Sequence, residues 1–455
     1  MTFLVLCLPA PAQVISHIDI DGNRHTHDEV ILRELCFSIG DTVPPDNLDQ
    51  YFSCSEDNLL NTSLFVRVNI TEHIVSDSIQ VRIELKERWY YWVYPILEHA
   101  DRNLSAFLNN ADWKKVNYGL SFEKHNLFGR NQFLKLKLRY GYREQLGLLY
   151  ENPAVDKQGK HGVQLFADRF RQRQVAVGNQ NDRQIYFYQP DEVAIHENRA
   201  GLVYTSRPEL RKRVRMIGSF HHFSLSDTLF ARQADYLTHA EQNASYLSIR
   251  MQFESDRRDK KYFPANGYYL FFQLRKDGIG LLENSPDFLR FDTELAFYHQ
   301  FNEKWYYAAE YFLKYHIMNQ ENIPYYLSEM SGYEHYPRGY ELFPVHAGSG
   351  SGLNQTIKYR LLAREMYKIN NMPVYEFDEI YYELFLYSFV DMAGSRKFKS
   401  YGYDNELEGA FLMSSGLGLE CQTFYDRSFG MHLAFTNLKA FGIFAWFHSP
   451  LYKIY

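Results

Sequence analysis

The sequence predicts a membrane β-barrel of about 16 antiparallel strands, preceded by one small α/β domain. Aromatic residues make up 17% of the 455 residues, with 37 Tyr and 35 Phe, yet 23% of residues are charged and the mean hydropathy is negative. No apolar run reaches the ~18 residues of a transmembrane helix. Strands that alternate lipid-facing and lumen-facing residues account for this combination. On composition alone, a soluble Tyr-rich β-protein such as a sugar-binding sandwich is the alternative.

We interpret residues 1–12 as the remnant of a secretory signal peptide. The apolar run Phe3–Leu8 precedes Ala10-Pro11-Ala12, which has the form of a cleavage site. No Lys or Arg occurs before Arg24, so the basic region of such a peptide is missing and the true start of the precursor stays open. The later cysteines, Cys36, Cys54 and Cys421, do not make a disulfide framework. A Cys36–Cys54 bridge stays open, but we expect buried free thiols.

Residues 13–88 are expected to form a compact unit with the order β-α-α-β-β. Val14–Ile20 is a short apolar strand, and Thr26 stands three residues before Glu29, the spacing of a capping box. The helix that starts there should turn Val30, Ile31 and Leu35 inward. We expect a second helix and two further strands at Leu48–Leu60, Phe65–Ile74 and Ile79–Glu87.

Residues 89–455 lose the helical pattern and show long alternating strands. In Phe133–Tyr140, for example, Leu134, Leu136 and Leu138 alternate with lysine and arginine. At ~10 residues per strand plus turns, this region holds on the order of 16 strands. If the sheet lies in lipid it must close into a barrel, because an open edge leaves backbone groups unpaired in hydrocarbon.

Short motifs occur in order along the chain and resemble one family. They are Ile18–Asn23, Gly40-Asp41, Ile83–Arg88, Asn126–Asn131, Asp256–Asp259 with Phe263–Tyr268, Arg338–Tyr340, Phe389–Gly394 and Ser415–Leu419. Together they resemble the BamA/TamA/Sam superfamily of outer-membrane assembly and secretion proteins over nearly the whole chain. The resemblance implies that residues 13–88 are a POTRA domain and that residues 89–455 are an outer-membrane barrel.

The resemblance also implies that the segment with Arg338, Gly339 and Tyr340 folds back into the barrel lumen. We hypothesise that Arg338 pairs there with Asp391, since an enclosed charge needs a charged partner. An exposed turn arginine is the alternative. Lys358 stands about where the family has a second acidic partner, so that partner is expected elsewhere or the clamp is weaker.

The mid-barrel signature consists of Asp256, Arg258, Asp259, Pro264 and Gly267. We interpret its aspartates as lumen charges balanced by Arg257 and Arg258, rather than as metal ligands. Gly267 is expected to supply a turn with positive φ.

The last strand, Gly442 to Phe447, has the alternating apolar form of the family's closing strand. Gly442, Phe444, Trp446 and Phe447 are therefore predicted to form a seam, with a strand near Tyr118–Phe122 on the other side. A tail, His448 to Tyr455, follows; it either extends beyond the seam or contains the true last strand at Leu451 to Tyr455.

Enzyme chemistry is not expected, nor is a cofactor or a metal. Gly348–Gly352 places its serines at the wrong offsets for a G-x-S-x-G elbow, and adjacent His221 and His222 point to opposite faces of a strand. The net charge of −6 argues against nucleic acid.

The function implied by the resemblance is assembly or insertion of outer-membrane β-barrels. A translocation pore for a secreted partner, or a membrane anchor for a surface protein, is the alternative. The implied partners are client polypeptides, the lipid bilayer and accessory periplasmic or lipoprotein subunits. The implied location is the outer membrane of a Gram-negative bacterium, with the POTRA domain in the periplasm.

Overall fold

The structure is a computed structural model that describes residues 13–44, 47–75, 78–99, 116–189, 192–237, 241–283, 285–317, 325–327, 329–331, 336–341, 343, 345–370, 372–396, 405–438 and 440–448. The expected signal-peptide remnant and the alternative last strand after His448 lie outside these residues. Within them, no helix has the length and apolarity needed to span a membrane.

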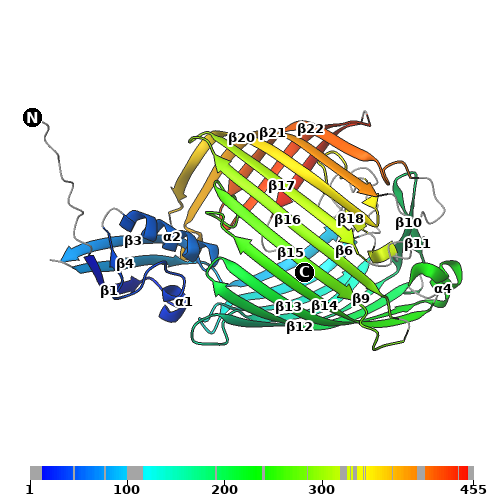
Figure 1. Ribbon diagram of the computed structural model, residues 1–455, viewed down its shortest axis with the longest axis horizontal. Coiled ribbons are helices and arrows are strands. Elements are labelled where there is room, and N and C mark those ends of the chain that lie inside the picture. The colour runs from blue at the N-terminus through cyan, green and yellow to red at the C-terminus, as the bar shows by residue number, and fades with distance from the viewer. Residues whose placement is uncertain are drawn as a thin grey trace, which may run out of the picture.

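The N-terminal residues form a small α/β unit at one end of the molecule (Figure 1). Its sheet has the order β2-β1-β4-β3, in which only β1 and β4 pair in parallel. The expected β-α-α-β-β order is present, with a two-residue strand added between the helices. The elements are β1 (Gln13–Asp21), α1 (Asp28–Leu32), β2 (Thr42–Val43), α2 (Leu48–Asn61), β3 (Phe65–Val75) and β4 (Ser78–Glu87).

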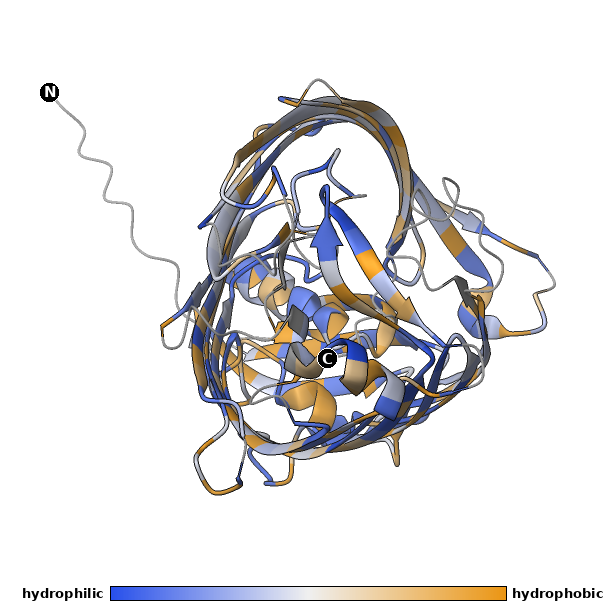
Figure 2. Cartoon of the chain, turned by 90° about the vertical axis from the view of Figure 1, so that its right-hand side faces the viewer, coloured by the Kyte–Doolittle hydropathy of each residue, from blue (hydrophilic) through white to orange (hydrophobic). Residues whose placement is uncertain are grey.

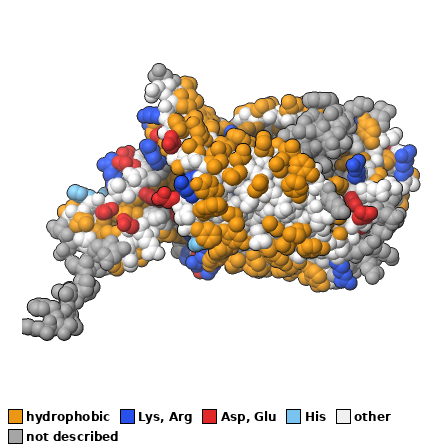
Figure 3. Space-filling model, turned by 90° about the horizontal axis from the view of Figure 1, so that it is seen from above, with side chains coloured by type: hydrophobic (Ala, Val, Ile, Leu, Met, Phe, Trp, Pro, Cys, Tyr) orange, Lys and Arg blue, Asp and Glu red, His pale blue; other side chains and the backbone are white. Residues whose placement is uncertain are grey.

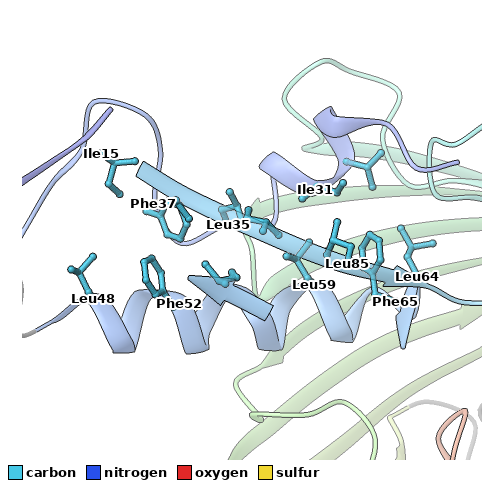
Figure 4. Close-up of a cluster of buried hydrophobic side chains, with 14 of the residues drawn as sticks. Ile15, Ile31, Leu35, Phe37, Leu48, Phe52, Leu59, Leu64, Phe65 and Leu85 are labelled. Carbon is cyan, nitrogen blue, oxygen red and sulfur yellow. The ribbon is translucent and has the colours of Figure 1, made fainter. Parts of the chain in front are cut away.

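Helix α2 covers one face of this sheet with an apolar stripe. Leu48, Phe52 and Leu59 lie on one side of the helix, as their spacing requires, and all three are buried. They face the sheet in Figure 4, where Ile15 and Leu85 complete the same cluster. Burial of this stripe holds the helix against the sheet.

Helix α1 differs from the prediction at its start. It begins at Asp28, and no side chain caps it. Thr26 instead donates its hydroxyl to Glu87. The capping-box prediction is therefore wrong, because a long-range acceptor competes for the threonine. The inward positions Val30, Ile31 and Leu35 are buried as predicted, although Leu35 lies past the end of the helix.

The expectation of free thiols in this unit is also wrong. Cys36 and Cys54 form a disulfide that joins the chain after α1 to the middle of α2. The Cys36 backbone N–H donates to Ser55 Oγ at 2.9 Å, so the two segments already touch beside the bridge. Cys421 is free.

The rest of the chain forms a 16-stranded sheet whose neighbouring strands are antiparallel, as predicted. Seen end-on, the sheet curls into a ring (Figure 2). Its strands are β5 (Tyr91–His99), β6 (Val116–Leu127), β7 (Gln132–Gly141), β8 (Arg143–Asn152), β9 (His161–Gln172), β12 (Ile195–Glu209), β13 (Lys212–Leu225), β14 (Asn243–Asp256), β15 (Gly267–Asp277), β16 (Phe288–Gln300), β17 (Trp305–His316), β20 (Ser349–Lys368), β21 (Glu379–Arg396), β22 (Phe411–Thr423), β23 (Arg427–Thr436) and β24 (Phe441–His448).

On the face seen in Figure 3, hydrophobic side chains form a broad band across the barrel, and charged side chains gather on either side of it. This is the surface of a barrel that spans a bilayer. We call the end that carries the N-terminal unit the near end. Several short elements lie outside the main sheet: β10 (Gln174–Gln180), β11 (Arg183–Tyr188), α4 (Asp227–Arg232), η3 (Ala234–Tyr236), η5 (Tyr325–Leu327), β18 (Glu329–Ser331), β19 (Val345–His346) and η6 (Tyr375–Phe377).

Candidate functional site: lumenal arginine and barrel seam

Arg338 lies inside the barrel and makes the predicted pair with Asp391. Its Nε and Nη2 donate to the two carboxylate oxygens at 2.7 and 2.6 Å, and its backbone N–H donates to Oδ2 at 2.9 Å. Asp391 is fully buried. The guanidinium also lies 4.1 Å from the centroid of the Phe389 ring. The pairing prediction is confirmed, and the alternative of an exposed turn arginine is wrong.

A neutral group takes the place of the second acidic partner. Thr356 Oγ1 accepts from Arg338 Nη2 at 2.9 Å, next to the Gln355 carbonyl oxygen at 3.2 Å. Lys358 instead pairs with Glu420 at 2.6 Å. The arginine therefore has one anionic partner and several neutral acceptors, as the departure from the family pattern suggested.

Gly339 and Tyr340 fix the same segment against the neighbouring part of the lumen wall, on β22 and β23. Gly339 has a φ of +94°, and a Cβ atom there would lie 3.0 Å from Ala434 Cβ, so only glycine fits without strain. Tyr340 is buried, and its hydroxyl donates to Asn437 Oδ1 at 2.6 Å. The segment thus contacts β21 through Arg338 and β23 through Gly339.

A second anchor of this segment was not predicted from the sequence. Glu341 Oε1 lies 3.0 Å from His432 Nε2, and both side chains are buried. Glu341 Oε2 also accepts from the Gly339 backbone N–H at 2.7 Å. Nothing local marks His432 as a partner of residue 341, because the two residues meet only after the sheet curls.

The mid-barrel signature forms the β14–β15 turn at the near end. Arg258 pairs with Asp256 through two contacts of 2.7 Å, which agrees with the prediction. Asp259, however, accepts backbone N–H groups of the turn, including that of Ala265 at 3.0 Å, and Arg257 contacts Glu209 at 3.7 Å. The interpretation as a charge balanced by arginine is therefore wrong for Asp259, because backbone N–H groups of its own turn occupy the carboxylate.

Gly267 supplies the turn geometry that the sequence predicts for the signature. Gly267 has a φ of +109°, as expected, and a Cβ atom there would lie 2.2 Å from the Arg257 carbonyl oxygen. Pro264 lies within the turn. In the described part of the chain, no group of three or more His, Cys, Asp or Glu residues is arranged to hold a metal ion.

The N-terminal unit is fixed to the near end by polar contacts with several turns. Glu34 accepts both Nη groups of Arg207 at 2.7 Å, and Lys86 pairs with Asp378. Burial raises the pKa of Glu34, but the hydrogen bond and charge of Arg207 outweigh burial and hold this pKa below its ordinary value. These contacts reach β12 and the β20–β21 turn, so the unit lies across the near end.

The contacts of the unit extend to the signature turn and to the seam. The Asn61 side chain donates to the Asp259 carbonyl oxygen at 3.0 Å. Arg88, which leads into β5, pairs with Asp426 in the β22–β23 turn at 2.6 Å.

The two terminal strands of the barrel sheet are β5 and β24, and no ladder joins them in the described residues. The prediction that Tyr118–Phe122 borders the seam is wrong. That segment lies in β6, which pairs with β5 on one side and β7 on the other. Alternation does not reveal β5, since Tyr91–Leu97 is apolar on both faces and contains Pro95.

The predicted closing strand lies at the seam as β24. Phe444 is buried in a cluster with Tyr387, Phe389 and Ala434, and Trp446 Nε1 donates to the Tyr387 hydroxyl at 3.2 Å. Phe447 is exposed on the opposite, outer face. The inward-facing side chains of β24 are therefore packed against residues of β21 and β23. Gly442 lies on that same face, where a Cβ atom would meet the Phe444 ring.

Aromatic contacts hold the near end of the seam together. The Trp92 ring lies 5.4 Å from Tyr425 and 5.8 Å from Phe377, measured between centroids. The Trp89 backbone N–H donates to the Tyr425 hydroxyl at 3.0 Å. The start of β5 is thus fixed, and no ladder joins β5 to a strand on the seam side among the described residues.

These features define an outer-membrane-type β-barrel with an inward-folded, arginine-anchored segment. Residues 126–423 match the Omp85 superfamily domain, and the chain belongs to the Omp85 superfamily. A search of curated proteins finds no match.

Solved structures share the fold at low sequence identity. The chain is similar to BamA from Haemophilus ducreyi lacking POTRA domains 1–3, with 13% identity, a TM-score of 0.51, and coverage of 96% of this chain and 84% of that one. It is also similar to CdiB from Escherichia coli, with 10% identity, a TM-score of 0.56, and coverage of 96% and 76%.

Proposed function

We propose that this chain assembles or inserts other β-barrels in the outer membrane of a Gram-negative bacterium. The observation that carries the proposal is the seam between β5 and β24, which has no ladder in the described residues. Backbone groups left unpaired in hydrocarbon are costly. A client strand that pairs with them removes this cost and is delivered directly into the bilayer.

The short strands at the seam support the same role. Among the described residues, β24 has eight residues and β5 has nine, near or below the ~9–11 residues that a strand needs to cross a bilayer. A short apolar band thins the bilayer locally, which lowers the barrier to inserting a neighbouring strand.

The N-terminal unit offers a second edge for an extended client. β3 has 11 residues and lies at the edge of the four-stranded sheet, whereas the opposite edge strand, β2, has two. A client peptide, or an accessory periplasmic or lipoprotein subunit, would add to β3 by β-augmentation. The Cys36–Cys54 disulfide suits an oxidising compartment and supports a periplasmic location for this unit.

The proposed role requires no catalytic residue, nucleotide or cofactor, because folding of the client supplies the free energy. The alternatives are a translocation pore and a membrane anchor for a surface protein. A translocation pore needs a clear lumen, and the segment held by Arg338 and Asp391 lies within it. Insertion through the seam leaves that segment in place, and for this reason we favour insertion.

The test is reconstitution of the full chain in liposomes, with a urea-unfolded small outer-membrane barrel as client. We expect faster appearance of the folded, heat-modifiable client than in liposomes without the protein. In cells, depletion should remove many barrels from the outer membrane. Loss of a single secreted protein, with barrels unaffected, would instead indicate translocation.

A further inference from the structure

A small cavity lies where the N-terminal unit meets the near end of the barrel. Its volume is about 180 Å³, below the ~300–1,000 Å³ of a site that encloses a whole small-molecule ligand. The cavity is therefore suited to a single ion or to one end group of a larger molecule. Arg33, from the end of α1, lines it together with Lys160 in the β8–β9 turn and Arg207 near the end of β12.

The two arginines of this cavity share one carboxylate, that of Glu34, and share it unequally. Both Nη groups of Arg207 donate to Glu34 at 2.7 Å, and its Nε donates to the Leu210 carbonyl oxygen at 3.0 Å. In the described part of the chain, the only polar contact of the Arg33 guanidinium is that of Nε with Glu34 Oε1, at 3.4 Å. Both Nη groups of Arg33 are therefore available to a ligand.

The pKa values of the two arginines follow this unequal pairing. Burial lowers the pKa of Arg207, but the hydrogen bond and charge of Glu34 outweigh burial and hold this pKa above its ordinary value. Burial also lowers the pKa of Arg33, where the attraction to Glu34 is opposed by the charge of Arg207, and this pKa lies below its ordinary value. The charge of Arg33 is thus only partly balanced within the protein, and an anion beside its Nη groups would balance it.

The other charged groups at the cavity leave this excess of positive charge in place. Lys160 is exposed and makes no ion pair among the described residues. Glu209, the one acidic side chain in the described wall, already pairs with Lys212 at 2.7 Å. Asp156, in the same turn as Lys160, accepts the His161 backbone N–H at 2.8 Å. An anion is therefore the kind of ligand that fits this cavity.

A phosphate group matches the donors that the cavity offers. The planar guanidinium of Arg33 can donate two parallel hydrogen bonds to one phosphate, and the remaining oxygens can accept from the ammonium group of Lys160. Gly159, next to Lys160, has a φ of +67°, and a Cβ atom there would lie 2.9 Å from Arg33 Cδ, so glycine keeps room for the arginine. We propose that the cavity binds a phosphate group, which joins Arg33 of the N-terminal unit to Lys160 of the barrel.

A lipid headgroup or a free phosphate ion can supply this group. The outer face of β12 is apolar and exposed as far as Leu202 and Tyr204, and tyrosine is enriched at the interface of a bilayer. Arg207 stands three residues further along the strand, about 10 Å at ~3.3 Å per residue. Phosphates of the adjacent leaflet therefore lie at the depth of the cavity.

The test uses full-length protein in dodecyl maltoside, a detergent without phosphate, and has one arm for each source. Inorganic phosphate is titrated in the first arm and phosphatidylglycerol in the second. Hydrogen exchange of residues 153–160 reports binding, since a bound phosphate should order the turn that carries Lys160. We expect saturable protection in at least one arm, and the arm with the lower midpoint identifies the source.

Two variants and a matched control assign the protection to the cavity. Arg33→Gln should raise the midpoint about tenfold, the effect of one hydrogen bond between charged groups. Lys160→Gln should raise the midpoint as well, and it changes an exposed side chain that makes no ion pair among the described residues. Lys157, exposed in the same turn, does not line the cavity, so Lys157→Gln removes the same charge and should leave the midpoint unchanged.

Two results would overturn the proposal. The first is the absence of protection in both arms. The second is an equal rise in the midpoint for Lys157→Gln and for the two cavity variants, because it would indicate a diffuse attraction of phosphate to basic surface residues rather than a site at Arg33 and Lys160.

Discussion

Replacement of Asp391 by alanine should release the lumenal segment from the barrel wall. The substitution leaves Arg338 enclosed and without its anionic partner, and such a loss costs about 3–5 kcal/mol. Arg338 keeps Thr356, the Gln355 carbonyl oxygen and the Phe389 ring. The expected cost is therefore at the low end, about 3 kcal/mol, or roughly a 150-fold larger population of the released segment.

Hydrogen exchange of residues 336–341, measured by mass spectrometry on the reconstituted protein, reports this population. The Arg338 amide, which donates to Asp391 itself, should exchange about 100-fold faster in Asp391→Ala. Glu420→Gln is the matched control, because it disrupts the Lys358–Glu420 pair of the same wall without touching the segment. Equal protection in Asp391→Ala and the parent protein would refute the reasoning.

Three further predictions concern the N-terminal unit and the lumenal segment. Cys36→Ser should destabilise the N-terminal unit by about 3 kcal/mol, as expected for a loop of 18 residues, and lower the urea concentration at which protease cleaves it; an unchanged midpoint would contradict this. Burial, followed by the charge of Asp259, raises the pKa of Asp57 from 3.8 to about 6, so the folded state binds the proton more tightly and the unit's stability should decrease as pH rises from about 4 to 6. The urea midpoint of the unit should therefore fall as pH rises across that range, and this fall should be smaller in Asp57→Asn. An equal fall in both proteins would contradict the prediction. Gly339→Ala should raise exchange in residues 336–341 by about tenfold, because positive φ and the contact with Ala434 cost about 1–3 kcal/mol, and parent-like protection would show that the site tolerates a Cβ atom.

The periodicity of apolar residues predicts the strands and the helix whose burial repeats along the chain. Strands with one polar and one apolar face, such as β7, follow from alternation, and α2 follows from its apolar stripe. The motif order predicts the Arg338–Asp391 pair although the residues lie 53 positions apart.

Features set by long-range contacts are not visible in the same way. Glu341 contacts His432, which lies 91 positions away in the sequence. Thr26 donates its hydroxyl to Glu87 and does not cap the helix that follows it. Strand β5 is missed because neither of its faces is polar. The Cys36–Cys54 bridge is missed because an odd number of cysteines gives no pairing rule.

The seam can be tested directly by closing it. Val93→Cys and Ile443→Cys place one cysteine on each strand that borders the seam, and a short bifunctional thiol reagent with a photocleavable linker then ties β5 to β24 in a Cys421→Ser background. We predict that the tied protein fails to insert the client barrel into liposomes and that photolysis of the linker, which leaves the Cys36–Cys54 disulfide intact, restores insertion. Undiminished insertion by the fully tied protein would contradict the conclusion that clients enter between these two strands.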